Sequence, residues 1–227
     1  MSVVHIILAA KGVDAVAVTA LGALRSLLGF GDSLWTLERF RLFEVTSGTE
    51  ESTVVRSLEG YLQRTFEFWN PNKERCWIRT GKGALEVIPG QAPRTSPVPG
   101  VGADSLLLWQ LPDSGAALRF DRPGPEGAQI DPSTPDPDTE LRPTASQGLP
   151  RDFPRELGGD AVVARRGEVY SFSWSDEPDE NERRARIERA GAVRNRGEGL
   201  LVQPQYQLSR ISIGSLPWPV WEPELTR

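Results

Sequence analysis

Cysteine and histidine are almost missing from this chain, which has one of each in 227 residues. The single cysteine, Cys76, excludes an intrachain disulfide framework and a cluster of metal-binding thiolates. The single histidine, His5, excludes zinc sites built from several imidazoles and leaves a Ser–His–Asp triad only one candidate base. These two absences remove many classes of enzyme before any motif is considered.

An excess of basic residues is also missing. The 31 Asp and Glu residues outnumber the 26 Lys and Arg residues, which gives a net charge of −5. Proteins that bind nucleic acids need Lys and Arg to displace counterions from phosphates, and polybasic membrane-surface proteins need a similar excess. The composition therefore argues against both classes, and the length indicates one or two domains.

The first thirty residues are apolar without being typical of a membrane helix or a signal peptide. Lys11, Gly12, Asp14 and Arg25 interrupt them, whereas a membrane-spanning helix needs about 20 predominantly apolar residues. No basic stretch precedes the apolar run, as a signal peptide requires. We favour folded structure here, with a targeting segment or membrane contact as the alternatives, and we expect an intracellular protein, either cytoplasmic or organellar.

Residues 1–88 have the pattern of a small α+β domain. Strand-length apolar segments lie at residues 3–10, 34–45, 76–78 and 84–88. Residues 13–28 repeat apolar side chains at helical spacing. A second amphipathic helix is predicted after Ser47–Glu50, which fits a capping box, and it runs to Trp69. The order β-α-β(β)-α-β predicts a ferredoxin-like packing of two helices on one sheet.

Residues 89–158 differ from the rest in composition, because they hold 13 of the 19 prolines. One apolar segment, Ser105–Leu111, is a candidate strand. The run from Pro123 to Pro154 has too little apolar surface to offset the entropy of an ordered chain. We predict a Pro/Gly-rich linker or an extended arm that lies on a partner, and plain disorder is the alternative.

Residues 159–227 are predicted to form a small, mainly β C-terminal unit with one helix. Residues 161–174 have the pattern of a hairpin whose turn is at residues 165–168. A charged helix is expected over residues 179–190, and a further strand over residues 206–213.

The chain ends in a tail rich in tryptophan and proline, residues 216–221, which contains too much proline for an interior strand. Tryptophan is enriched at the energetic centres of protein interfaces. We therefore predict that Trp218 and Trp221 contact protein partners, together with Trp109 from the candidate strand of the arm.

No set of residues has the spacing of a catalytic, cofactor-binding or metal-binding motif. A phosphate-binding GxxxxGK[ST] loop is absent. Cys76 has no histidine nearby in the sequence to activate it, so we expect a structural strand residue, and His5 is expected to be a core or surface residue. Six basic residues between positions 183 and 196 alternate with glutamates, which is typical of a solvated helix. The prediction is a chain with no catalytic residue, metal or cofactor.

Five segments of the last third follow one another in a fixed order. They are Gly159–Glu168, Asp176–Pro178, Arg186–Gly191, Leu208–Gly214 and Glu222–Thr226. In this order, and with nearly the same spacings, they resemble the central segment of PPM-type metal-dependent protein phosphatases, the protein phosphatase 2C family. That family binds two metal ions through Asp residues and uses them to hydrolyse phosphate esters.

The departures from this family fall on its metal ligands. The Asp-Gly-His motif of the family does not occur here, and Gly214-Ser215 stands where the family has Gly-Asp. Without those carboxylates nothing would hold the metals that activate water. The resemblance therefore implies a degenerate segment without phosphatase chemistry.

The first eighty residues more faintly resemble PurS, the small non-catalytic subunit of the phosphoribosylformylglycinamidine synthase complex. The matching features are Lys11-Gly12-Val13, Ala23-Leu24, Leu28-Gly29-Phe30 and Asn70-Pro71 before a strand. This resemblance supports the ferredoxin-like shape and implies a role in purine synthesis.

We therefore predict a non-catalytic structural or assembly subunit that binds other proteins through its arm and its tail. One alternative is a PurS-like small subunit of a purine-synthesis amidotransferase complex. A second alternative is an active metal-dependent phosphatase.

Overall fold

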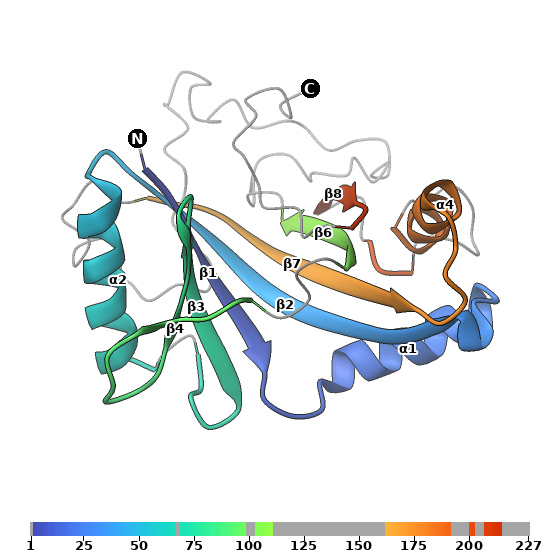
Figure 1. Ribbon diagram of the computed structural model, residues 1–227, viewed down its shortest axis with the longest axis horizontal. Coiled ribbons are helices and arrows are strands. Elements are labelled where there is room, and N and C mark those ends of the chain that lie inside the picture. Colours follow the sequence, from blue (N-terminus) through green and yellow to red (C-terminus); the bar gives the residue numbers. More distant parts are fainter. Residues whose placement is uncertain are drawn as a thin grey trace, which may run out of the picture.

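The computed structural model describes residues 2–66, 69–98, 103–110, 162–191, 200–202 and 207–214. These residues form a single antiparallel sheet in the order β5-β4-β3-β1-β2-β7-β6-β8, with helices packed against it (Figure 1). The prediction of an α+β protein is confirmed at this level. The elements are β1 (Ser2–Ala10), α1 (Ala15–Leu27), the 3₁₀ turn η1 (Gly31–Ser33), β2 (Leu34–Ser47), α2 (Glu51–Arg64), β3 (Glu74–Thr80), β4 (Gly83–Val87), β5 (Arg94–Thr95), β6 (Asp104–Gln110), β7 (Val162–Trp174), α4 (Glu180–Gly191) and β8 (Gln207–Ser212).

The long strand β2 joins the two halves of the molecule into one sheet. Its residues Phe40–Ser47 pair with β1, and almost its whole length, Leu34–Thr46, pairs with β7. The structure does not show a separate ferredoxin-like sheet over residues 1–88. Helix α1 continues past the end of β1 and packs on the far half of β2, so β2 returns antiparallel to β1 and presents its other edge to β7 (Figure 1).

Two further predictions about local structure are wrong. The hairpin expected over residues 161–174 is one continuous strand, β7, because its expected turn pairs with Arg41–Glu44 of β2. The capping box at Ser47–Glu50 does not form either. Ser47 is still paired with Ser2 in the sheet, its hydroxyl accepts from the Thr49 amide, and α2 begins at Glu51.

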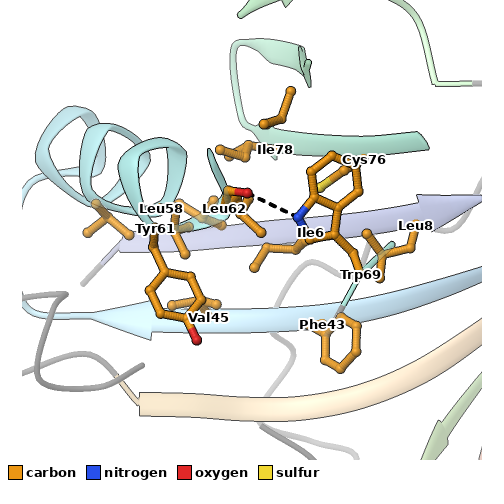
Figure 2. Packing of buried hydrophobic residues seen from close by; sticks show 13 residues of the cluster. Ile6, Leu8, Phe43, Val45, Leu58, Tyr61, Leu62, Trp69, Cys76 and Ile78 are labelled. Atoms are coloured by element: carbon orange, nitrogen blue, oxygen red, sulfur yellow. Dashed lines mark hydrogen bonds between the residues drawn. The ribbon is translucent and has the colours of Figure 1, made fainter. Parts of the chain in front are cut away.

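One face of the sheet carries two core clusters side by side. Alternate residues of a strand point to the same face, so Leu37, Phe43 and Val45 of β2 all face the helices. Phe43 and Val45 belong to the cluster under α2, where Leu58 and Tyr61 pack on β1 and β3 (Figure 2). Trp69 closes that cluster, and its indole Nε1 donates to the carbonyl of Leu62 at 3.1 Å.

The second cluster on this face lies under α1 and α4. It combines Leu24 of α1 and Ile187 of α4 with Leu37 of β2, Leu106 of β6 and Phe172 of β7. Helices that are far apart in the sequence thus share one core at the end of the sheet away from α2 (Figure 1).

The opposite face of the sheet is also apolar at its centre, where Trp77, Leu107, Trp109 and Val169 cluster. Gly167 is required here by a close approach, because a Cβ at this position would lie 2.7 Å from both the Leu108 carbonyl oxygen and the Trp109 ring. The segment Asp104–Gln110, which the sequence places within the Pro/Gly-rich arm, is therefore an interior strand of the sheet. Residues 111–161, with most of that predicted arm, lie outside the described residues.

Candidate functional site

A cleft of about 590 Å³ opens where β1 ends and α1 begins. Its walls are the segment Ala10–Ala15 and residues of the segment Asn70–Glu74, with Arg39 and Arg41 of β2 between them. We call it the lysine cleft, after Lys11 and Lys73 in its lining. The two segments are fixed to each other, since the Lys11 amide donates to the Lys73 carbonyl at 2.8 Å and the Lys11 ammonium donates to the Pro71 carbonyl.

Ion pairs join the strand arginines of this cleft to its carboxylates. Arg39 contacts Asp14 at 2.9 Å and Glu168 at 3.3 Å. Burial alone would lower the pKa of Arg39, but the two carboxylates outweigh that effect and the pKa lies above its ordinary value. Asp14 also caps α1 by accepting from the Val16 and Ala17 amides. One carboxylate therefore fixes both the start of α1 and a strand arginine.

The second arginine of the cleft is held in the same way. Arg41 of β2 contacts Glu74 at 2.5 Å, and the other oxygen of Glu74 accepts from the Asn70 amide at 2.8 Å. Carboxylates engaged in this way are poor candidates for metal ligands or for a general base.

A second cleft, of about 370 Å³, lies between the start of β6, the end of β7 and the start of α4. At its base is Asp104, which is 3% exposed. Its carboxylate accepts from the Trp174 indole at 2.8 Å, from the Arg183 guanidinium at 2.9 Å and from the Gly214 amide at 2.9 Å. These donors come from β7, α4 and the segment after β8, so Asp104 ties three elements together.

Glu177, beside this second cleft, is the one non-glycine residue with a positive φ (47°) in the described part of the chain. The turn that contains it leads into α4, where Arg186 binds both oxygens of Asp176, at 3.0 and 2.7 Å, and also binds Glu182. The contact with Arg186 lowers the pKa of Asp176 below its ordinary value. The strained turn is therefore held in place by an ion pair.

His5 and Glu44 form a buried pair on the face of the sheet opposite the helices, 3.4 Å apart, with Arg165 at 3.9 Å from Glu44. Cys76 belongs to the core cluster on the helix face. The chain's one imidazole and one thiol are thus separated by the sheet and cannot act together. Burial also raises the pKa of the Cys76 thiol far above its ordinary value, so the thiol stays protonated.

Of the three tryptophans predicted to bind partners, Trp109 alone lies within the described residues. The Trp109 ring is packed into the sheet's second face and is 5% exposed, which makes it a core residue and not a surface contact. Trp218 and Trp221 lie outside the described residues. Trp35, which the sequence analysis did not single out, is 65% exposed at the start of β2.

The segments that resemble the phosphatase family are described only in part. Asp176–Pro178 is the turn before α4, and Arg186–Gly191 is the last part of that helix. In the described ranges no three His, Cys, Asp or Glu side chains gather as a metal site.

No protein-family model matches the chain, and no curated protein or solved structure is significantly similar to it. The resemblances to PPM phosphatases and to PurS therefore stay predictions.

Helix α1 exposes apolar side chains where a surface helix ordinarily carries charges. Val16, Ala20, Ala23 and Leu27 are spaced by four, three and four residues, so they share one flank of the helix. We call these four residues the α1 surface. Val16 is 46% and Leu27 is 69% exposed. Arg25 is the one charged residue of α1, and its guanidinium donates to the Leu34 and Trp35 carbonyls.

No described helix has the length and the hydropathy to span a bilayer. Contiguous exposed apolar side chains mark surfaces that contact proteins, membranes or ligands.

Proposed function

We propose that this chain is a non-catalytic subunit that binds protein partners, and that the α1 surface is one of its contacts. The observation that carries the proposal is the absence of charge on the outward side of α1, together with the exposure of Leu27 and Val16. The other helices of the sheet carry charged residues in their first turns, whereas α1 carries none.

The spacing of the α1 surface suits a helix-and-groove contact. Residues at positions i, i+4, i+7 and i+11 supply the successive anchors when a helix enters an apolar groove. Since Leu27 is 69% and Val16 is 46% exposed, covering the rest would stabilise a complex by about 1–2 kcal/mol for Leu27 and about 1 kcal/mol for Val16. Ala20 and Ala23 between them are half-buried, and Ala20 packs against the core cluster, so Val16 and Leu27 are the accessible anchors.

The charged groups of the two clefts also support a binding role over a catalytic one. Arg39 and Arg41 pair with carboxylates, and Asp104 accepts from three donors. These charged groups hold helices and strands in place through their ion pairs and hydrogen bonds. A general acid or base needs a site open to substrate and a pKa near the working pH.

The predicted contribution of Trp218 and Trp221 belongs to the same proposal and lies outside the described residues. The purine-synthesis alternative predicts co-purification with a large ATP-dependent amidotransferase. The phosphatase alternative predicts manganese-dependent hydrolysis of a phosphoester by the purified chain.

The test is to isolate the tagged protein from its native cells, with and without the substitution Leu27→Lys, and to measure the size and composition of what it carries. We expect the unmodified chain to elute with a defined partner in fixed proportion, and Leu27→Lys to reduce that partner by about tenfold or more. The matched control is Ala185→Lys, which adds the same charge at an exposed position of α4. Elution of the unmodified chain as a free monomer would contradict the proposal, as would equal loss of the partner in both variants.

A further inference from the structure

Lysine is rare in this chain, and its placement is uneven. Only three of the 26 basic residues are lysines: Lys11, Lys73 and Lys82. Two of these three line the lysine cleft, although they are 62 positions apart in the sequence. Elsewhere the chain uses arginine, whose planar guanidinium suits paired contacts with carboxylates. The lysine ammonium is a compact charge with three freely directed donors, which suits a phosphate group.

Basic side chains outnumber acidic side chains at the lysine cleft. Its two arginines pair with three carboxylates, those of Asp14, Glu74 and Glu168, so the surplus of positive charge comes from the two lysines. Within the described ranges, neither Lys11 nor Lys73 has a carboxylate within 4 Å. The charge comes from these side chains and not from the start of α1, because Asp14 already occupies the Val16 and Ala17 amides. On a chain with a net charge of −5, this is a local reversal of sign.

The remaining lining of the cleft combines apolar residues on one wall with Asn70 and Asn72 on the other. Leu8, Ala10, Val13 and Ala15 contribute to it, and Gly12 leaves space beside Lys11. A volume of about 590 Å³ lies within the range of clefts that hold small organic molecules. Since Lys11 is bonded to the Asn70–Glu74 segment, the two walls are held together before any ligand arrives.

We propose that the lysine cleft binds a small organic molecule that carries a phosphate monoester. The ammonium groups of Lys11 and Lys73 contact the phosphate, and the apolar residues contact the organic part. This site is separate from the α1 surface and does not depend on the proposed function. It is a binding site, and no reaction is assigned to it.

Calorimetric titration of the purified full chain with phenyl phosphate, at constant ionic strength, tests this proposal. We expect saturable binding at one site, tighter than that of inorganic phosphate by about fivefold or more because the ring covers apolar surface. Lys73→Gln is expected to weaken binding of phenyl phosphate by about tenfold, through loss of one charged contact. The Lys73 side chain makes no hydrogen bond or ion pair in the described structure, so this variant is expected to keep the melting temperature of the parent.

The matched control is Lys82→Gln, which removes the same charge from the turn between β3 and β4, outside the cleft. We expect it to bind phenyl phosphate like the parent. The proposal is overturned by absence of saturable binding, by inorganic phosphate binding as tightly as phenyl phosphate, or by Lys82→Gln weakening binding as much as Lys73→Gln.

Discussion

Helices α1 and α4 lie at the same end of the sheet (Figure 1) and pack against the same core cluster, but the side chains that they expose differ in character. Charged residues make up most of α4 (ENERRARIERAG), whereas α1 (AVAVTALGALRSL) has only Arg25. The outer side chains of α4 pair with one another, as Arg184 does with Glu180, and remain compatible with water. The exposed apolar side chains of α1 form no hydrogen bonds with water, and their exposure is unfavourable. This difference in exposed side chains supports the proposal that α1 contacts another protein.

Substitutions in the buried sides of α1 and α4 should lower the free energy of unfolding by similar amounts. Leu24 of α1 and Ile187 of α4 are both 0% exposed. We expect Leu24→Ala and Ile187→Ala each to lower the free energy of unfolding by about 2–5 kcal/mol, because each leaves a cavity in the shared core. Urea unfolding of both variants measures this. A loss below about 1 kcal/mol for either residue would show that its helix is not part of the core.

The anchoring of α4 depends on the buried carboxylate of Asp104, whereas α1 is fixed at its start by the half-buried carboxylate of Asp14. We expect Asp104→Ala to lower the free energy of unfolding by about 2–3 kcal/mol, since it leaves the Trp174 and Arg183 donors without their acceptor. Arg184→Ala, which breaks only an exposed pair, serves as the control and should cost less than about 0.5 kcal/mol. Equal effects of the two substitutions in chemical denaturation would remove Asp104 from its anchoring role.

Substitutions on the exposed sides of α1 and α4 should leave stability unchanged, so that any effect on binding can be measured separately. We expect Leu27→Lys and Ala185→Lys both to change the free energy of unfolding by no more than about 0.5 kcal/mol, because both positions are exposed. The thermal unfolding midpoints of the two purified variants provide the measurement. If Leu27→Lys alone were strongly destabilising, Leu27 would be a core residue and its loss of binding would have a structural cause.

The smallest effect concerns the pH response at the start of α4. The pKa of Asp176 is lowered by Arg186, so this contact stabilises the fold above the ordinary carboxyl pKa of about 3.9 and is lost as the pH falls through the lower folded value. Carboxyl-carbon NMR should show Asp176 titrating below its ordinary range, and Arg186→Gln should restore that range. Arg184→Gln should leave the titration unchanged, since Arg184 pairs with Glu180 instead. A normal Asp176 pKa in the parent would contradict the ion pair.

Local patterns in the sequence predicted most of the helices and strands but not how they are arranged. The apolar spacing of residues 13–28 predicts α1 within two residues, and the charged segment 179–190 predicts α4 equally well. The pairing of β2 with β7 could not be predicted, because more than a hundred residues separate the two strands and no local pattern fixes their register. The residues Arg165–Glu168 look like a turn in isolation and become strand only when Arg41–Glu44 lies beside them.

The candidate sites were missed for a similar reason. The lysine cleft exists only because the segments that carry Lys11 and Lys73 are bonded to each other in the folded chain. The α1 surface did have a sequence signal, namely an apolar helix with a single charge, but that signal equally fits a helix buried on all sides. Only the observed exposure of Leu27 and Val16 separates the two interpretations.

The central claim, that the α1 surface contacts a protein, is tested most directly by photo-crosslinking in the native cells. A benzophenone amino acid would be placed at position 27 of α1 in one variant and at position 185 of α4 in another. We predict that position 27 forms one covalent adduct of defined mass, with the same protein that co-elutes with the unmodified chain, and that position 185 forms none. Absence of an adduct at position 27, or an identical set of adducts at both positions, would contradict the claim.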